Sequence, residues 1–177
     1  MNDINDRPTF ETIKLTQLQF NPFDLIQNRG MLLTAGDREH ANSMMINWGM
    51  MGVVWNRNVV EVLVRPQRHT HGLLAKQSSF SLSLFDRSQK EQMLYFGTHS
   101  GKDEDKYAAT GFHLDYFEDI PYIAESKFVL FCRKIYVDEF NPEGYLEPLV
   151  PVEHYAKKDF HIRYIGEIQL VKQRVDS

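Results

Sequence analysis

The feature of the sequence that most limits its fold is a series of short segments rich in branched and aromatic residues, each ending near turn-forming residues. In the segment SFSLSLF, residues 79–85, Phe80, Leu82 and Leu84 alternate with serines, and this period of two predicts a half-buried strand. No long helical pattern separates such segments, which favours a β-barrel or sandwich. Further strands are predicted over residues 31–36, 59–65, 127–137 and 160–172.

Turn and bulge signals connect these segments. A short hairpin loop is predicted over residues 56–58, and Gly166 is expected to mark a bulge in the last strand. Residues 141–159 hold three of the seven prolines and are predicted to form a long loop. Because the length suits one domain and no internal repeat is present, residues 1–177 are expected to form a single domain.

Short helices are predicted at three places between the strands. One begins at Thr70, a residue of the N-cap type, and a second begins at Ser88, whose spacing from Glu91 fits a capping box. A third has an acidic first turn over residues 103–105 and ends before Gly111, which suits a helix C-terminus. The predicted fold class is therefore mainly β, a barrel with short helices.

Charge and the single cysteine limit the possible partners and location. The net charge is −4 and no long run of Lys and Arg is present, so nucleic-acid binding is not expected. No apolar run approaches the roughly 20 residues that span a bilayer, and the start of the chain lacks a signal peptide pattern. Cys132, in an apolar segment, is predicted to be buried, and one unpaired cysteine suits the cytoplasm.

The sequence RPQRHTHG, residues 65–72, is the first candidate binding segment. Arg65 and Arg68 can form paired hydrogen bonds to phosphate oxygens, and Thr70 at a helix start adds a hydroxyl and exposed backbone N–H groups. The alternative is that both arginines are solvated or paired with acidic residues such as Glu61 or Asp86, while Thr70 only caps its helix. Taken alone, the segment slightly favours this alternative.

Two further segments carry candidate residues. In SGKDEDKY, residues 100–107, only Ser100, Gly101 and one lysine, Lys102 or Lys106, can face an anion, because three carboxylates lie between them. The alternative is an acidic helix start in which Lys106 pairs with a neighbouring carboxylate. In NSMMINWGMMG, residues 42–52, thioethers, a tryptophan and two glycines suit either a core or a flat heteroaromatic ligand.

Several enzyme signatures are absent from the sequence. It contains no glycine-rich dinucleotide fingerprint, no Walker loop and no nucleophile elbow. His69 and His71, and His154 and His161, do not match a metal-binding spacing and are predicted to be scattered surface residues. No metal site is therefore expected.

Taken in order, the three segments resemble the flavin reductase-like proteins with an FMN-binding split barrel. The pattern of that family runs N-x-M-T-x-S-W-G, then R-P-x-R-x-T, then S-G-x-D-x-D-K. The likeness covers about residues 31–133 and continues more loosely to the end of the chain. The matching residues are Asn42, Met44, Trp48, Gly49, Arg65, Pro66, Arg68, Thr70, Ser100, Gly101, Asp105 and Lys106.

The resemblance implies a six-stranded, Greek-key-like split barrel that forms a homodimer, with FMN near the subunit interface. It implies that Arg65 orients a loop and that the flavin accepts hydride from NADH or NADPH. The alternative is a non-catalytic FMN carrier of the flavoredoxin type that passes electrons between proteins. The residues implied to hold the phosphate are Arg68, Thr70, Ser100, Gly101 and Lys106, and those implied to line the flavin ring are Asn42, Met44, Met45, Ile46, Asn47 and Trp48.

The sequence departs from the family pattern at two positions of the ring segment. Met45 stands where the pattern has threonine, and Asn47 stands where it has serine. A hydroxyl that could reach the flavin edge is thereby lost at residue 45. Because hydrogen bonds near the ring tune flavin reactivity, the change is expected to affect redox behaviour more than binding.

Overall fold

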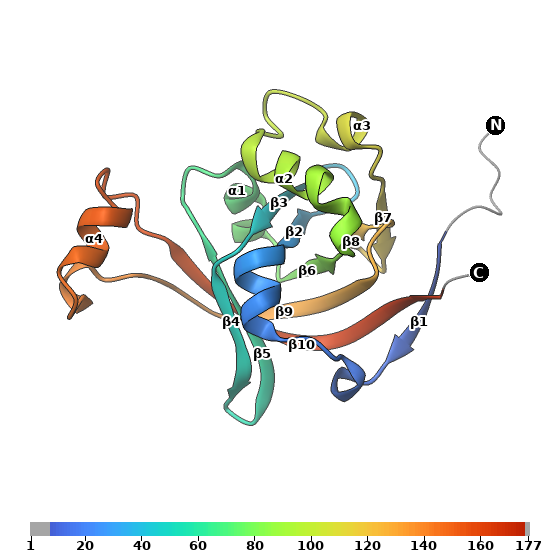
Figure 1. Cartoon of the computed structure of the whole chain (residues 1–177), viewed down its shortest axis with the longest axis horizontal. Coiled ribbons are helices and arrows are strands. Elements are labelled where there is room, and N and C mark those ends of the chain that lie inside the picture. The colour runs from blue at the N-terminus through green and yellow to red at the C-terminus, as the bar shows by residue number, and fades with distance from the viewer. Residues whose placement is uncertain (1–7, 176–177) are drawn as a thin grey trace.

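A curled antiparallel sheet of eight strands forms the body of the protein (Figure 1). The computed structural model describes residues 8–175, so part of the chain start on which the signal-peptide prediction rests lies outside the described residues. The order is β3-β2-β6-β9-β10-β5-β4, and β1 also pairs with β10. The strands are β1 (Thr9–Ile13), β2 (Met31–Gly36), β3 (Ala41–Ile46), β4 (Gly49–Val54), β5 (Arg57–Val64), β6 (Ser79–Leu84), β9 (Phe128–Glu139) and β10 (Ile162–Val175).

The predicted β-barrel is confirmed by the way the core is shared. Side chains of β2, β3, β5, β6, β9 and β10 join one buried apolar cluster, which includes Leu33, Met44, Val62 and Leu82. Strands β3 and β5 are separated by four others in the sheet, so they can share a core only because the sheet curls round. These six strands form the barrel wall, and β1 and β4 extend the sheet to eight.

A small hairpin and short helices surround the barrel. Helices α2 and α3 cover one side of it (Figure 1). Within the described residues, no helix is long and apolar enough to cross a membrane. The hairpin is formed by β7 (Leu114–Phe117) and β8 (Ile120–Ile123), and the helices are α1 (His69–Lys76), α2 (Lys90–Thr98), α3 (Lys106–Thr110) and α4 (Leu149–His154), with a π-helical segment Asp24–Arg29 and 3-10 turns Leu15–Gln17, Arg87–Gln89 and Pro142–Gly144.

Strand β6 was correctly located but is not half-buried. Ser81 and Ser83 are fully buried, together with Phe80 and Leu82 on the opposite face. The Ser81 hydroxyl donates to the Pro121 carbonyl at 2.6 Å, which satisfies it against the β8 hairpin. The serines therefore face a second layer of protein and not solvent.

The bulge prediction at Gly166 is confirmed, whereas the hairpin prediction is shifted. The pairing of β10 with β9 changes register between Ile165 and Gly166. The β4–β5 turn consists of Trp55 and Asn56, with φ of 53° and 56°, and not of residues 56–58. Positive φ at both central residues is the geometry of a type I′ hairpin turn.

Two helix starts and the long loop also differ from prediction. Helix α1 begins at His69, with Arg68 and not Thr70 at the N-cap position. Helix α2 begins at Lys90 without a side-chain cap hydrogen bond, because Ser88 lies in the preceding 3-10 turn. The predicted loop 141–159 contains α4 and projects from the barrel as an arm, at the left in Figure 1.

The predicted end of α3 and the predicted burial of the cysteine are confirmed, whereas the predicted start of α3 is wrong. Gly111 adopts the left-handed conformation at φ 71° directly after α3. The helix begins at Lys106, so the acidic residues precede it, and Asp105 is its N-cap. Cys132 is buried at 1% exposure, and burial raises the pKa of its thiol far above the ordinary value.

Candidate functional site

The three segments singled out in the sequence meet at two adjoining hollows on the barrel. One hollow, of about 410 Å³, is lined by Asn42, Met44, Arg65, Gln67, Arg68, His69, Thr70, Phe96, His99, Ser100, Gly101 and Lys106. The other, of about 290 Å³, is lined by Met44, Met45, Ile46, Asn47, Trp48, Leu63, Arg65, Arg68 and His161. Met44, Arg65 and Arg68 belong to both hollows. The eleven residues implied to hold the phosphate or line the ring, and Arg65, therefore all line one or both of them.

Asn42 of β3 joins the three segments. Its side-chain NH2 donates to the Thr70 hydroxyl at 2.8 Å, and both residues are buried. A Cβ atom at Gly101 would lie only 2.1 Å from Asn42 Oδ1, so residue 101 can approach Asn42 this closely only as glycine. The 410 Å³ hollow is thus held in shape before any ligand enters.

Lys106 places a buried positive charge in the same hollow. Lys106 is only 2% exposed. Its Nζ atom donates a hydrogen bond to the Ser43 carbonyl at 2.6 Å and lies 5.0 Å from the centre of the Phe96 ring. Among the described residues it forms no ion pair with a carboxylate. Burial, and then the charge of Arg68, lower the pKa of Lys106 to about 8. Such a charge is suited to receive an anion.

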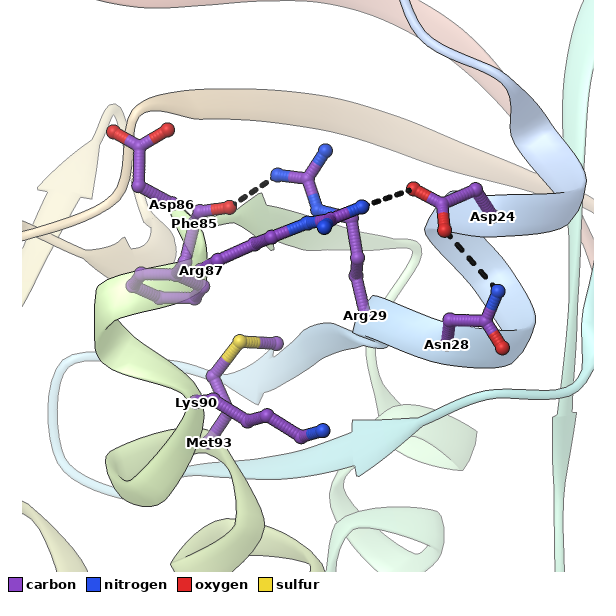
Figure 2. Close-up of a pocket in the computed structure, with 8 residues that line it drawn as sticks. All are labelled: Asp24, Asn28, Arg29, Phe85, Asp86, Arg87, Lys90 and Met93. Carbon is purple, nitrogen blue, oxygen red and sulfur yellow. Dashed lines mark hydrogen bonds and ion pairs between the residues drawn. The ribbon is translucent and has the colours of Figure 1, made fainter.

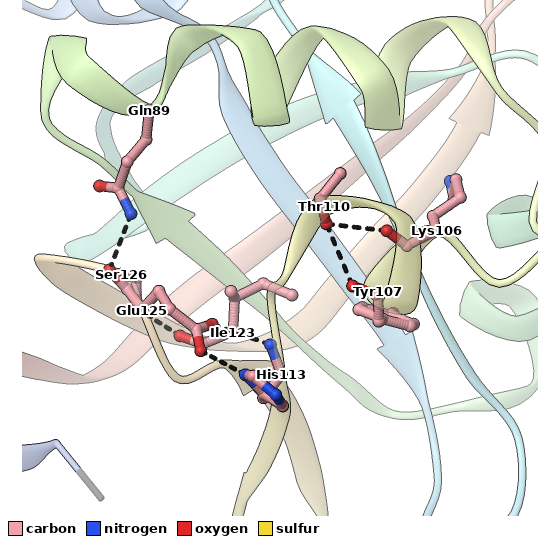
Figure 3. A network of polar contacts seen from close by, with 8 residues as sticks. All are labelled: Gln89, Lys106, Tyr107, Thr110, His113, Ile123, Glu125 and Ser126. Carbon is pink, nitrogen blue, oxygen red and sulfur yellow. Dashed lines mark hydrogen bonds and ion pairs between the residues drawn. The ribbon is translucent and has the colours of Figure 1, made fainter. Parts of the chain in front are cut away.

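Helix α3, which carries Lys106, is fixed at both ends. The Asp105 carboxylate accepts hydrogen bonds from the Tyr107 and Ala108 backbone N–H groups. The Thr110 hydroxyl donates to the Lys106 carbonyl at 2.7 Å, as Figure 3 shows. In the same view, His113 binds Glu125 through Nδ1 at 2.7 Å, which ties the segment after α3 to the end of β8. The backbone of Lys106 is therefore well positioned.

Arg68 and Arg65 differ in how far the chain itself engages them. Within the described residues, the Arg68 guanidinium makes one long hydrogen bond, 3.4 Å to the Gly97 carbonyl, and the residue lines both hollows. Arg65 forms an ion pair with Asp159 and donates to the His154 carbonyl at 2.9 Å. These two contacts attach the projecting arm to the end of β5.

The 290 Å³ hollow is bordered by a group of aromatic and histidine rings. Trp48 is 40% exposed. The centre of its ring lies 5.0 Å from that of the His161 ring and 5.2 Å from that of the His154 ring. His161 Nδ1 shares a 2.8 Å hydrogen bond with the Tyr155 hydroxyl. Burial, followed by the charge of Arg65, lowers the pKa of His161 to about 4, so its ring is neutral at pH 7.

The prediction that all four histidines lie at the surface is wrong for His161, which is 7% exposed. The pairing of Ile162 with Val64 places His161 beside Arg65, a register that the sequence alone does not reveal. Sequence reasoning missed the following lining residues, of which Gln67 and His69 occupy unspecified positions of the R-P-x-R-x-T motif and the others lie outside the three motifs: Leu63, Gln67, His69, Phe96, His99 and His161.

Met45, one of the two departures from the family pattern, lines the 290 Å³ hollow and packs into the structure behind it. Cβ atoms built at Gly30 and Gly97 would lie 2.5 Å and 3.3 Å from atoms of the Met45 side chain. The thioether is thus packed between the end of Asp24–Arg29 and helix α2, where a threonine would leave space. Residues 8–175 contain no group of three or more His, Cys, Asp or Glu that could hold a metal ion.

The antiparallel sheet that curls round one apolar core, with two adjoining hollows on the barrel, places the protein in the split-barrel class. Its sequence matches the model of the flavin reductase like domain over residues 24–173, and the chain belongs to that family. Comparison with curated protein sequences found no match.

The fold is shared with solved structures of low sequence identity. Flavoredoxin from Methanosarcina acetivorans is 24% identical, with a TM-score of 0.64, and the match covers 88% of this chain and 74% of that one. An FMN-binding domain of a flavin reductases-like enzyme from Shewanella baltica is 16% identical, with a TM-score of 0.66 and coverages of 95% and 78%. An NADH:FAD oxidoreductase from Streptomyces globisporus is 19% identical, with a TM-score of 0.61 and coverages of 82% and 74%.

Proposed function

We propose that the protein binds FMN across the two joined hollows, with the phosphate in the larger and the flavin ring in the smaller. The observation that carries this proposal is Lys106, a buried cation that has no carboxylate partner within residues 8–175, in one hollow with Arg68 and Thr70. A phosphomonoester supplies about 1.5 to 2 negative charges and three acceptor oxygens, which match these donors. The adjoining hollow at Trp48 combines thioether, aliphatic and indole side chains with polar groups of residues such as Asn47 and Arg65, which suits a flavin ring with apolar faces and a polar edge.

The FMN proposal is tested by the Arg68→Ala variant. Loss of a charge-assisted hydrogen bond, worth about 1.5 to 3 kcal/mol, should weaken FMN binding roughly 10- to 100-fold. Riboflavin, which lacks the phosphate, should bind the variant and the parent equally well. Flavin affinities are measured by quenching of flavin fluorescence on titration with the protein, and the flavin released from purified protein is identified by mass. An equal loss for riboflavin would contradict the phosphate role.

We further propose that the protein is an oxidoreductase in which bound FMN takes hydride from NADH or NADPH and passes the two electrons to an acceptor. The flavin supplies the redox chemistry, and the protein positions both rings and limits the access of water. Family membership supports this activity. His161, neutral at pH 7 and at the edge of the ring hollow, can hydrogen-bond either ring without adding charge.

Reductase activity is tested by mixing the FMN-loaded protein with NADH or NADPH without oxygen and following loss of the flavin absorbance. Rapid bleaching by one of the nucleotides is expected. A flavin that neither nucleotide reduces, yet which dithionite reduces, would contradict the reductase proposal while leaving FMN binding intact.

The second candidate is an FMN carrier that exchanges electrons between proteins. The observation that favours it is Met45, which fills the position behind the ring hollow where the family pattern has a hydroxyl. The similar fold of a flavoredoxin gives it a precedent. Slow reduction by both nucleotides with fast reduction by a protein donor, such as a reduced ferredoxin, would favour the carrier.

We also propose that the protein is a homodimer. Its apolar side chains at the tip of the β4–β5 hairpin are exposed, with Val53 at 68% and Trp55 at 62%. Exposed groups of this kind mark protein contact surfaces when they gather in one place. A second copy of the chain is the occupant that the family resemblance suggests.

A further inference from the structure

A third hollow, away from the proposed flavin site, gathers positive charge in an acidic protein. It measures about 320 Å³ and lies between the segment Asp24–Arg29 and the start of α2. Figure 2 shows its cationic side chains, which come from two separate places in the sequence: Arg29 ends the π-helical segment, whereas Arg87 begins the 3-10 turn after β6 and Lys90 begins α2 directly after that turn. The net charge of the whole chain is −4, so this concentration of cations is local.

The two carboxylates at this hollow do not balance its three cations. Asp86 pairs at 3.0 Å with Lys127, which is not part of the lining. Asp24 accepts a 3.1 Å hydrogen bond from Asn28 and lies 3.5 Å from Arg87, a long ion pair whose arginine side chain is 81% exposed. With Asp86 paired outside, three cations face one carboxylate, and the hollow carries a net positive charge.

Arg29 has hydrogen-bonding capacity to spare. One of its terminal nitrogens donates to the Phe85 carbonyl, an interaction also drawn in Figure 2. Its Nε atom is buried and has no hydrogen-bond partner among the described residues. A buried N–H without a partner is costly unless a ligand satisfies it. Arginine donors are planar and rigid, which suits the oxygens of a phosphate.

Helix α2 relates this hollow to the proposed flavin site. Lys90, at its start, lines the cationic hollow, while the carbonyl of Gly97, near its end, accepts the hydrogen bond from Arg68. Seven residues at 1.5 Å per residue separate the two by about 10 Å. Met45, which lines the 290 Å³ hollow, packs against Gly30, and Gly30 directly follows Arg29 of the cationic hollow. A nucleotide with one end at the ring hollow could therefore place a distant phosphate here.

We propose that the hollow of Arg29, Arg87 and Lys90 binds the phosphate groups on the adenosine side of the nicotinamide nucleotide. This inference rests on the proposed reductase function and extends it to the site where the hydride donor is held. Arg87 and Lys90 supply exposed charge at the surface, and Arg29 supplies a partly buried guanidinium that is anchored on the Phe85 carbonyl. The nicotinamide end is then free to reach the flavin ring beside Trp48.

The test uses the FMN-loaded protein and isothermal titration with adenosine 2′,5′-bisphosphate, a fragment that lacks the nicotinamide. In the double variant Arg87→Gln, Lys90→Gln, its affinity should fall at least about tenfold, since two charge-assisted contacts are lost. The KM for NADPH should rise in parallel, with FMN affinity unchanged. Arg38→Gln is the matched control, because Arg38 is also an exposed arginine paired with an aspartate, at 3.0 Å from Asp119.

Three outcomes would overturn the inference. One is the same affinity for adenosine 2′,5′-bisphosphate in the double variant as in the parent. Another is no binding of this fragment by the parent. The third is inorganic phosphate binding as tightly as the nucleotide fragment, which would make the hollow a general anion site. The titration does not involve hydride transfer, so it decides the site even if neither nucleotide reduces the flavin.

Discussion

At the scale of single residues, a substitution at Gly101 tests whether the 410 Å³ hollow, the proposed phosphate site, is preformed. A Cβ atom there would lie 2.1 Å from Asn42 Oδ1, and Asn42 also donates to Thr70. Gly101→Ala should displace the Asn42 side chain, break this hydrogen bond and lower FMN affinity at least about tenfold. The measurement is a fluorescence titration with FMN, alongside thermal unfolding.

Gly72→Ala provides the control for this prediction. Gly72 lies within α1, and an added Cβ would meet no atom within 4 Å. Alanine should stabilise the helix by about 0.5 to 1 kcal/mol and leave FMN affinity unchanged. Equal FMN affinity in Gly101→Ala and the parent would show that residue 101 does not shape the 410 Å³ hollow for FMN.

Lys106 should make FMN binding depend on pH. Burial and Arg68 lower its pKa to about 8, so the ammonium is present below that pH and is lost above it. The phosphate of FMN, with a second pKa of about 6, remains a dianion throughout this range. FMN affinity should therefore decrease as the pH rises from about 7 to about 9.5.

The Lys106 prediction is checked by titrating FMN and riboflavin at each pH. Lys106→Arg, which stays charged, should lose the dependence on pH, and riboflavin affinity should stay nearly constant in the parent. A riboflavin curve with the same slope as the FMN curve would assign the effect to the fold and not to the phosphate.

At the scale of elements, the sequence predicts where strands lie better than what covers them. The alternation in β6 correctly places Phe80 and Leu82 in the core, but Ser81 is equally buried because the distant β8 hairpin covers it. Likewise, nothing in the sequence suggests that Trp55 adopts a positive φ in the hairpin turn. Long-range covering and turn conformation depend on tertiary contacts, which periodicity does not describe.

The bulge in β10 gives a prediction about stability. A Cβ atom at Gly166 would lie 2.6 Å from Phe80 Cζ and 3.0 Å from Cys132 Cβ, both in the packed core. Gly166→Ala should lower the free energy of unfolding by about 1 to 3 kcal/mol, since the core must expand to accept the methyl group. Gly52→Ala in β4, whose Cβ meets nothing within 4 Å, should change it little. Urea unfolding measures both, and equal stabilities would contradict the packing argument.

At the scale of the whole molecule, the predicted site depends on segments that the fold brings together. Residues 42–48, 65–70 and 100–106 could be named in advance because their motifs, taken in order, resemble one family. Phe96 and His161 line the same hollows without any motif, since a helix packing angle and a strand register bring them there. Local sequence patterns therefore predict the motifs that line the two hollows, and only the assembled barrel reveals the other residues that line them.

The exposed hairpin tip leads to the last prediction, which concerns assembly. Val53 and Trp55 are more than half exposed, and the Trp55 ring lies 6.3 Å from that of Tyr136 on β9. The parent should sediment as a dimer, and the variant Val53→Thr, Trp55→Asn should shift toward monomer. Asparagine tolerates the positive φ at residue 55, so the turn itself should persist.

Leu94→Thr, which removes an exposed leucine from α2, is the control and should stay dimeric. Sedimentation velocity distinguishes these outcomes. A monomeric parent would contradict the dimer, whereas a dimeric double variant would place the contact elsewhere on the barrel.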